Sequence, residues 1–210
     1  MVHLHSIILT SLVVITGKIT LPMIAETFLA MNFLAPSPAK QLPTDLTVVP
    51  IPVVQYEGSW KCPDCSESEQ YVLAELQEHT KIKDRNALAT IMGNIKQESN
   101  FHSNICEGGA RVPYNACHRG GYGLIQWTSI GRYIGLGDFC NKYNCDPSSL
   151  EGQTRYMINE NIFQRQLPVF EGGGQTVSQY MVPAYYWLGW GIKGNREIYA
   201  YDYTKKFVLS

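Results

Sequence analysis

The sequence has few charged residues, no excess of charge of either sign and no uninterrupted apolar run long enough to cross a bilayer. Charged residues make up 17% of the 210 positions, and the formal net charge is -1. Nucleic-acid-binding domains carry a basic patch or stripe, so this balance argues against DNA or RNA as a partner. With 45% hydrophobic residues, the chain is apolar enough to bury a core. We therefore expect one folded domain of ordinary size and an appendage.

Two short apolar runs, at positions 7–16 and 29–34, lie in the first part of the chain. The first run is shorter than the roughly 20 apolar residues of a membrane-spanning helix, and charged residues separate it from the second. No lysine or arginine precedes it, although a secretory signal would carry one there. We interpret residues 1–35 as an anchor, a signal-like segment or a docking segment. Membrane contact through residues 7–34 is among these alternatives.

A proline-rich stretch follows the apolar runs. Its five prolines fall between positions 36 and 52, where no helical period is present. Closely spaced prolines favour an extended, polyproline-like backbone without a core of its own. We therefore predict a linker over residues 36–59 and a folded domain over residues 60–210.

All six cysteines lie in the predicted domain. Several pairings are formally available, and the spacings favour Cys62–Cys65, Cys106–Cys117 and Cys140–Cys145. Disulfides form in oxidising locations such as the periplasm, a virion or the extracellular space. The alternative is that several of the cysteines are buried free thiols, which behave as small hydrophobic residues.

Two zinc sites are further alternatives for the cysteines. Cys62 and Cys65 could supply half of a site, and a complete set could come from His102, Cys106, Cys117 and His118. The spacing of this complete set matches no standard zinc finger. We interpret the first pair as a local staple and predict neither a metal nor a cofactor.

Hydrophobic periodicity indicates a mostly helical domain. The strongest helix begins near Asp84 as its N-cap, and apolar residues recur at helical spacing from Leu88 to Ile95. The glycine-rich stretch between 101 and 123 is predicted to be a loop, with room for a short β-hairpin between 105 and 126. Further helices are predicted at 67–79, 129–143, 147–164, 176–188 and 194–207.

Glu98 lies where the strongest helical pattern ends, and an aromatic loop, Gly121–Thr128, follows it in the chain. Cleavage of a glycosidic bond requires a carboxylic acid that stays protonated near neutral pH, which an apolar pocket promotes. Phe101 and Trp127 are candidates for the walls of such a pocket. The negative end of the helix dipole near Glu98 favours the same protonated form. Taken alone, Glu98 would be an ordinary exposed residue at a frayed helix end.

The Gly121–Thr128 loop has the composition of a sugar-binding surface. Its glycines allow the backbone to approach a ligand closely. Tyr122 and Trp127 offer flat apolar faces with polar tips, and Gln126 could hydrogen-bond hydroxyl or acetamido groups. For Trp127 alone, packing in the core is the simpler interpretation. Together with Glu98, the loop predicts a site for glycoside cleavage.

The segment Gly93–Phe101, the loop Gly121–Thr128 and Arg132 together resemble the phage tail lysozyme family. That family carries Gly-Asn-x-x-x-Glu-Ser-x-Phe followed by Gly-x-Gly-x-x-Gln-Trp and an arginine. It belongs to the wider lysozyme and lytic transglycosylase superfamily. Looser matches follow at 150–160 and 194–200, so the resemblance extends over roughly residues 84–207.

The resemblance implies a mostly α, α+β lysozyme-like domain and a cell-wall muramidase activity. Glu98 would be the general acid, and Ser99 would brace the acid or its helix end. The resemblance implies no cofactor and no metal. The substrate-binding residues would be Ser99, Tyr122, Gln126 and Trp127.

The identity of a second carboxylate stays open. Glycosidases place one opposite the acid, and nothing in the spacing selects among Glu107, Asp138 and Glu171. If none serves, the 6-hydroxyl or acetamido group of the substrate completes the reaction, as in lytic transglycosylases. We favour hydrolysis and keep transglycosylation as the alternative.

The resemblance also implies a location and partners. Bacterial peptidoglycan would be the substrate, and the protein would belong to a virion tail that acts in the host periplasm or cell wall. Residues 1–60 would then bind other tail proteins. Two alternatives stay open: a membrane-released endolysin with the same acid, and a structural tail component that binds glycan without cleaving it.

Overall fold

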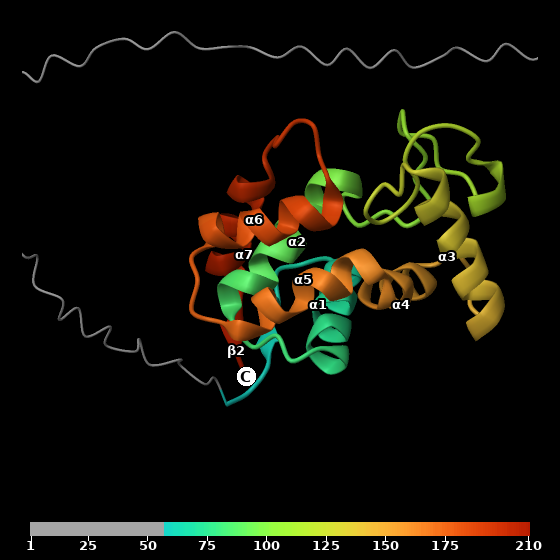
Figure 1. Ribbon diagram of the computed structural model, residues 1–210. Helices are drawn as coiled ribbons and strands as arrows, with labels where there is room; N and C mark the ends of the chain where they lie inside the picture. Colours follow the sequence, from blue (N-terminus) through green and yellow to red (C-terminus); the bar gives the residue numbers. More distant parts are fainter. Residues whose placement is uncertain (1–56) are drawn as a thin grey trace, which may run out of the picture. The chain divides into compact units, whose positions relative to one another are not determined.

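The computed structural model describes residues 57–210, so the predictions for residues 1–35 and for nearly all of the linker at 36–59 lie outside the described residues. Seven α-helices, one 3-10 helix and a two-stranded sheet form this part of the chain (Figure 1). The predicted mostly helical, α+β fold class is confirmed. No helix within residues 57–210 is long and apolar enough to cross a membrane. In chain order the elements are β1 (Trp60–Lys61), α1 (Glu67–His79), α2 (Arg85–Ser99), η1 (Tyr114–Ala116), α3 (Ile130–Tyr143), α4 (Leu150–Asn159), α5 (Asn161–Gly172), α6 (Val177–Leu188), α7 (Arg196–Lys206) and β2 (Val208–Leu209).

Helix α2 begins and ends at residues whose local chemistry favours a helix boundary. The Asp84 carboxylate accepts hydrogen bonds from the backbone N–H groups of Asn86 at 2.8 Å and Ala87 at 3.0 Å. At the other end, Asn100 adopts the left-handed conformation of a C-cap, with φ 50°. Glu98 is therefore held in the last turn of α2.

The single helix predicted at 147–164 is wrong, because the chain forms α4 and α5 there instead. Glu160 separates the two helices and has an extended backbone, with φ -67° and ψ 130°. Its buried carboxylate is bound by Arg132 of α3. A contact with a residue distant in sequence thus overrides the helical pattern at this position.

The β-hairpin expected between 105 and 126 is reduced to two isolated bridges, Ile105 with Arg111 and Cys106 with Tyr122. The two-stranded sheet lies elsewhere, where β1 pairs with β2 in antiparallel register. This sheet ties the first described element to the last one. The segment that follows Glu98 therefore stays a loop.

The predicted disulfide pairing is confirmed for all six cysteines. None of them is a free thiol. Both zinc alternatives are therefore excluded, because their cysteines bond to each other. The bonds are Cys62–Cys65, Cys106–Cys117 and Cys140–Cys145.

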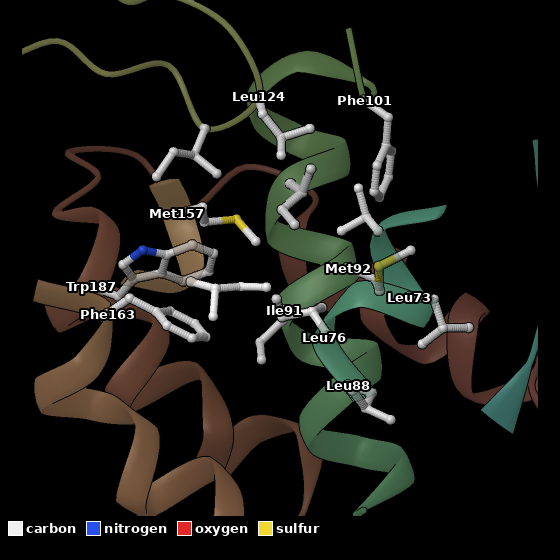
Figure 2. Close-up of a cluster of buried hydrophobic side chains, with 14 of the residues drawn as sticks. Leu73, Leu76, Leu88, Ile91, Met92, Phe101, Leu124, Met157, Phe163 and Trp187 are labelled. Atoms are coloured by element: carbon white, nitrogen blue, oxygen red, sulfur yellow. The ribbon is translucent and has the colours of Figure 1, made fainter. Parts of the chain in front are cut away.

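Helix α2 forms the centre of the core. Every residue of the Ala87–Ile95 stretch is buried, which is typical of a helix packed on all sides. It contacts α1, α5, α6 and α7. Figure 2 shows Leu88, Ile91 and Met92 of α2 among side chains from the surrounding helices. In the last turn of α2, Ser99 is still buried, whereas Lys96, Gln97 and Glu98 are partly exposed at the edge of the core.

Helices α2 and α7 cross in close contact at Gly93. A Cβ atom on this residue would lie 2.5 Å from the backbone nitrogen of Ala200 and 2.7 Å from the carbonyl oxygen of Arg196. Because protein cores are close-packed, any side chain here would push the two helices apart. The glycine therefore brings the start of α7 against the last turns of α2.

A buried polar cluster joins the same two helices to α1. Glu69 of α1 accepts hydrogen bonds from the hydroxyl of Tyr203 in α7 and from Nζ of Lys96 in α2, the second at 3.0 Å. Burial acts to raise the pKa of Glu69, but the hydrogen bonds from Tyr203, Ser66 and Lys96 outweigh it and lower this pKa to about 2. Glu69 is therefore charged in the folded protein well below neutral pH.

Gly93→Ala should lower the free energy of unfolding by about 1–3 kcal/mol, the usual cost of overpacking a core. The matched control is Gly131→Ala in α3, where an added Cβ meets nothing within 4 Å. That variant should be neutral or more stable by up to about 1 kcal/mol, since alanine favours helix over glycine. Urea unfolding followed by circular dichroism measures both. Equal stability of the two variants would contradict the close crossing.

Acid should destabilise the fold through Glu69. Its folded-state pKa lies below the unfolded value of 4.5, so its stabilising effect is complete above that pH and is lost as the pH falls towards about 2. The loss should be on the order of 3 kcal/mol, because one pKa unit corresponds to about 1.4 kcal/mol. Glu69→Gln should be less stable at neutral pH and should show a flatter pH dependence in the acid range. Denaturant unfolding at a series of pH values tests this, and parallel profiles for the two proteins would count against it.

Candidate active site

Glu98 lies in the wall of a cavity of about 700 Å³. The other walls come from the loop at 125–129, Arg132 of α3, the connector between α6 and α7 (residues 189–195), and Arg196 at the start of α7. Only 16% of the Glu98 side chain is exposed. Segments far apart in the sequence thus meet around one largely buried carboxylate.

Arg196 forms an ion pair with Glu98 through Nη2 and Oε1. Its other terminal nitrogen, Nη1, donates hydrogen bonds to the backbone carbonyls of Ile192 at 3.0 Å and Lys193 at 2.8 Å. The guanidinium carbon lies 4.8 Å from the centroid of the Trp190 ring. Because the Arg196 side chain is 7% exposed and held from several directions, it fixes the position of the Glu98 carboxylate.

The start of α7 is also fastened directly to the last turn of α2. The side-chain oxygen of Gln97 accepts a hydrogen bond from the backbone N–H of Asn195 at 2.8 Å. Gly194 precedes this contact in a left-handed conformation with φ 58°, and a Cβ there would lie 2.9 Å from Cδ of Gln97. A glycine is therefore required where the connector turns into α7.

Ser99 lies behind the cavity, not in its wall. It is buried, and its hydroxyl donates to the carbonyl oxygen of Leu124 at 2.7 Å. The backbone N–H of Leu124 donates in turn to Oε1 of Gln153 at 2.7 Å. Ser99 thus joins the helix that carries Glu98 to the glycine-rich loop. It does not reach the cavity as a substrate-binding residue would.

The structure corrects the expected positions of the aromatic side chains. Tyr122 and Trp127 are fully buried and Phe101 is nearly so, and none of the three lines the cavity. A Cβ on Gly123 would lie 2.3 Å from Oε1 of Gln153 in α4, so the loop packs tightly against that helix. Because of this tight packing, the aromatic rings of the loop point into the core.

Gln126 is the predicted sugar-binding residue that does line the cavity. Its backbone has φ 50°, a left-handed conformation that is uncommon for a residue with a side chain. Its Nε2 donates to the carbonyl oxygens of Gly123 at 3.0 Å and Ile105 at 3.3 Å. The side chain is therefore anchored to its own loop at the edge of the cavity.

A second ion pair, Arg132 with Glu160, borders the cavity through its arginine. Nε and Nη2 of Arg132 donate to the two carboxylate oxygens of Glu160 at 2.6 Å and 2.7 Å. Trp127 adds a longer hydrogen bond from Nε1 to the same carboxylate at 3.4 Å. Glu160 was not predicted as a site residue, although its segment is part of the looser resemblance. The pair fixes Arg132 in the cavity wall.

The three carboxylates considered as partners of the acid lie away from the cavity. Glu107 accepts a hydrogen bond from the backbone N–H of Gly121 at 3.0 Å, and Glu171 accepts one from that of Lys81 at 2.9 Å. Asp138 is exposed on α3. Among the described residues that line the cavity, Glu98 carries the only carboxylate.

A sequence model of the phage tail lysozyme family matches residues 67–180, which is more than half of the chain. This chain belongs to the phage tail lysozyme family. A lysozyme-like role in peptidoglycan degradation follows from that membership. Neither the curated proteins nor the solved structures gave a match to the chain. The matched range contains Glu98, whereas Trp190 and Arg196 lie beyond it. The sequence assigned neither of these two residues to the site.

The ion pair between Glu98 and Arg196 should show a coupling energy above about 1 kcal/mol in a double-mutant cycle, because removing one partner leaves a buried charge unpaired. Glu98→Gln, Arg196→Gln and the double variant supply the cycle, with free energies of unfolding from urea titration. The exposed pair Glu151 and Arg155 is the control, and its coupling should stay below about 0.5 kcal/mol. Additive effects at Glu98 and Arg196 would contradict the arrangement.

Proposed function

We propose that this member of the phage tail lysozyme family cleaves the glycan of bacterial peptidoglycan between its amino sugars, with Glu98 as the general acid. The observation that carries the proposal is that Glu98 provides the only carboxylate among the described residues that line a cavity of about 700 Å³. Family membership supplies the substrate class. No metal or cofactor enters the proposed reaction.

Glu98 would act on the glycosidic oxygen, which is a poor leaving group until it is protonated. The proton passes from the carboxyl group to that oxygen as the bond to the sugar carbon breaks and positive charge develops on the ring. The carboxylate that results is the form of Glu98 that pairs with Arg196. Arg196 is therefore a positioning residue that also stabilises the charge left by proton transfer.

In hydrolysis, water then adds to the sugar carbon and returns a proton to Glu98, which restores the acid. In transglycosylation, the 6-hydroxyl of the same sugar attacks that carbon and loses its proton to Glu98, which leaves an anhydro end. We propose hydrolysis as the reaction. The absence of a second carboxylate from the described cavity wall favours transglycosylation as the second candidate.

We also propose that the protein is part of the virion tail and acts in the periplasm or cell wall of the host. Three disulfides support a location outside the reducing cytoplasm. Residues 1–60 would bind other tail proteins. Detection of the protein in purified virions would support this location, and its recovery in host membranes before lysis would support the endolysin alternative.

Glu98→Gln should reduce cleavage of purified peptidoglycan by at least about 100-fold, because general acid catalysis typically contributes 100-fold or more. A zymogram and a turbidity assay measure the loss, with circular dichroism to verify folding. The control is Glu107→Gln, since that carboxylate lies outside the cavity and should leave activity near the parent level. Retained activity in Glu98→Gln would remove Glu98 from the role of acid.

Mass analysis of the products separates the two reactions. Reducing ends would establish hydrolysis, and anhydro ends would establish transglycosylation. If the parent protein binds glycan and releases no product, the protein is a structural, glycan-binding tail component instead.

A further inference from the structure

Trp190 is the only aromatic side chain among the described residues that line the Glu98 cavity. It lies in the connector between α6 and α7, at residues 189–195, and is half-buried. Glycines flank it on both sides, so its sequence neighbours contribute no side chain that would cover the ring. The cavity wall therefore contains one half-buried aromatic ring, and this ring lies outside the loop at Gly121–Thr128 that the sequence indicated.

The Trp190 ring is supported from two directions. The guanidinium carbon of Arg196 lies 4.8 Å from its centroid, and the ring of Tyr185 meets it edge-on at 5.3 Å and 80°. Arg196 is in turn held by Glu98 and by two backbone carbonyls of the connector. The ring and the acid thus share one support, so a ligand that lies on Trp190 takes a defined position relative to Glu98.

The rest of the wall has the chemistry that a pyranose ring requires. A pyranose presents C–H groups on its faces and polar groups around its rim. Trp190 and Ile192 provide apolar surface, while Gln126, Thr128 and Ser129 carry groups that can hydrogen-bond hydroxyl or acetamido substituents. One aromatic platform with polar groups around it is an arrangement that orients a sugar.

We propose that Trp190 is the platform on which an amino sugar of the glycan stacks beside Glu98. The inference rests on the proposed function, because it names a substrate contact in the same cavity. The ring binds and orients the sugar and takes no part in proton transfer. It occupies the role that the sequence suggested for Tyr122 and Trp127, whose rings are buried in the core.

The test measures binding without turnover, in the Glu98→Gln background, by titration calorimetry with a soluble oligosaccharide of N-acetylglucosamine. Trp190→Ala should weaken binding about tenfold, in keeping with the strength of aromatic contacts. Trp190→Phe keeps a flat ring and should stay within about threefold of its parent. In the protein with Glu98 intact, Trp190→Ala should raise KM for peptidoglycan about tenfold and leave kcat within about threefold.

The matched control is Tyr186→Ala, which removes an aromatic ring that is 62% exposed on α6 and lies outside the cavity. Its binding constant and KM should equal those of the parent. Unchanged KM and binding in Trp190→Ala, with the parent active, would overturn the inference and leave the proposed function intact. A fall in kcat alone, not reversed by Trp190→Phe, would also overturn it, because that result indicates only support of Arg196. Activity that survives Glu98→Gln would instead overturn the proposed function.

Discussion

Helices α2 and α7 approach each other closely because position 93 carries no side chain. The position of Arg196 beside Glu98 follows from this contact. The carbonyl oxygen of Arg196 lies 2.7 Å from the position that a Cβ on Gly93 would take, so the arginine begins α7 directly beside α2. From there its side chain reaches the carboxylate of Glu98. The cluster around Glu69 ties the same helices to α1 further along their length. The packing of the core therefore sets the position of the Glu98 carboxylate.

Two arginine–glutamate pairs border the cavity, and they have different consequences. In the pair of Arg132 and Glu160, both carboxylate oxygens are occupied by the guanidinium group and the glutamate is buried, so this pair is structural. It also holds the break between α4 and α5. In the pair of Arg196 and Glu98, the carboxylate lines the cavity and is available to a ligand there. The same kind of interaction thus supports the fold in one pair and fixes the position of the Glu98 carboxylate in the other.

Local signals in the sequence predicted much of the fold. The boundaries of α2 follow from Asp84 and Asn100, whose side chain and backbone conformation act within a few residues of where they stand. Each disulfide joins two cysteines that follow one another in the order of cysteines along the chain. The prediction of one long helix at 147–164 was wrong, because the break at Glu160 depends on an arginine 28 positions away. Between 105 and 126, where the sequence left room for a short hairpin, only two isolated antiparallel bridges form, and the strands of the sheet come from opposite ends of the described chain.

The sequence by itself determined the helical class, the disulfide pairing and the segment in which Glu98 and Ser99 lie, because these features depend on residues near one another in the chain. Only the tertiary structure decided which side chains surround Glu98. Arg196 is 98 positions from it, and Trp190 lies in the connector, before the looser match at 194–200. Tyr122 and Trp127 have the composition of a sugar platform, yet Gly123 packs their loop onto Gln153 and buries them. Composition describes what a side chain can bind, whereas long-range packing determines whether it meets the ligand.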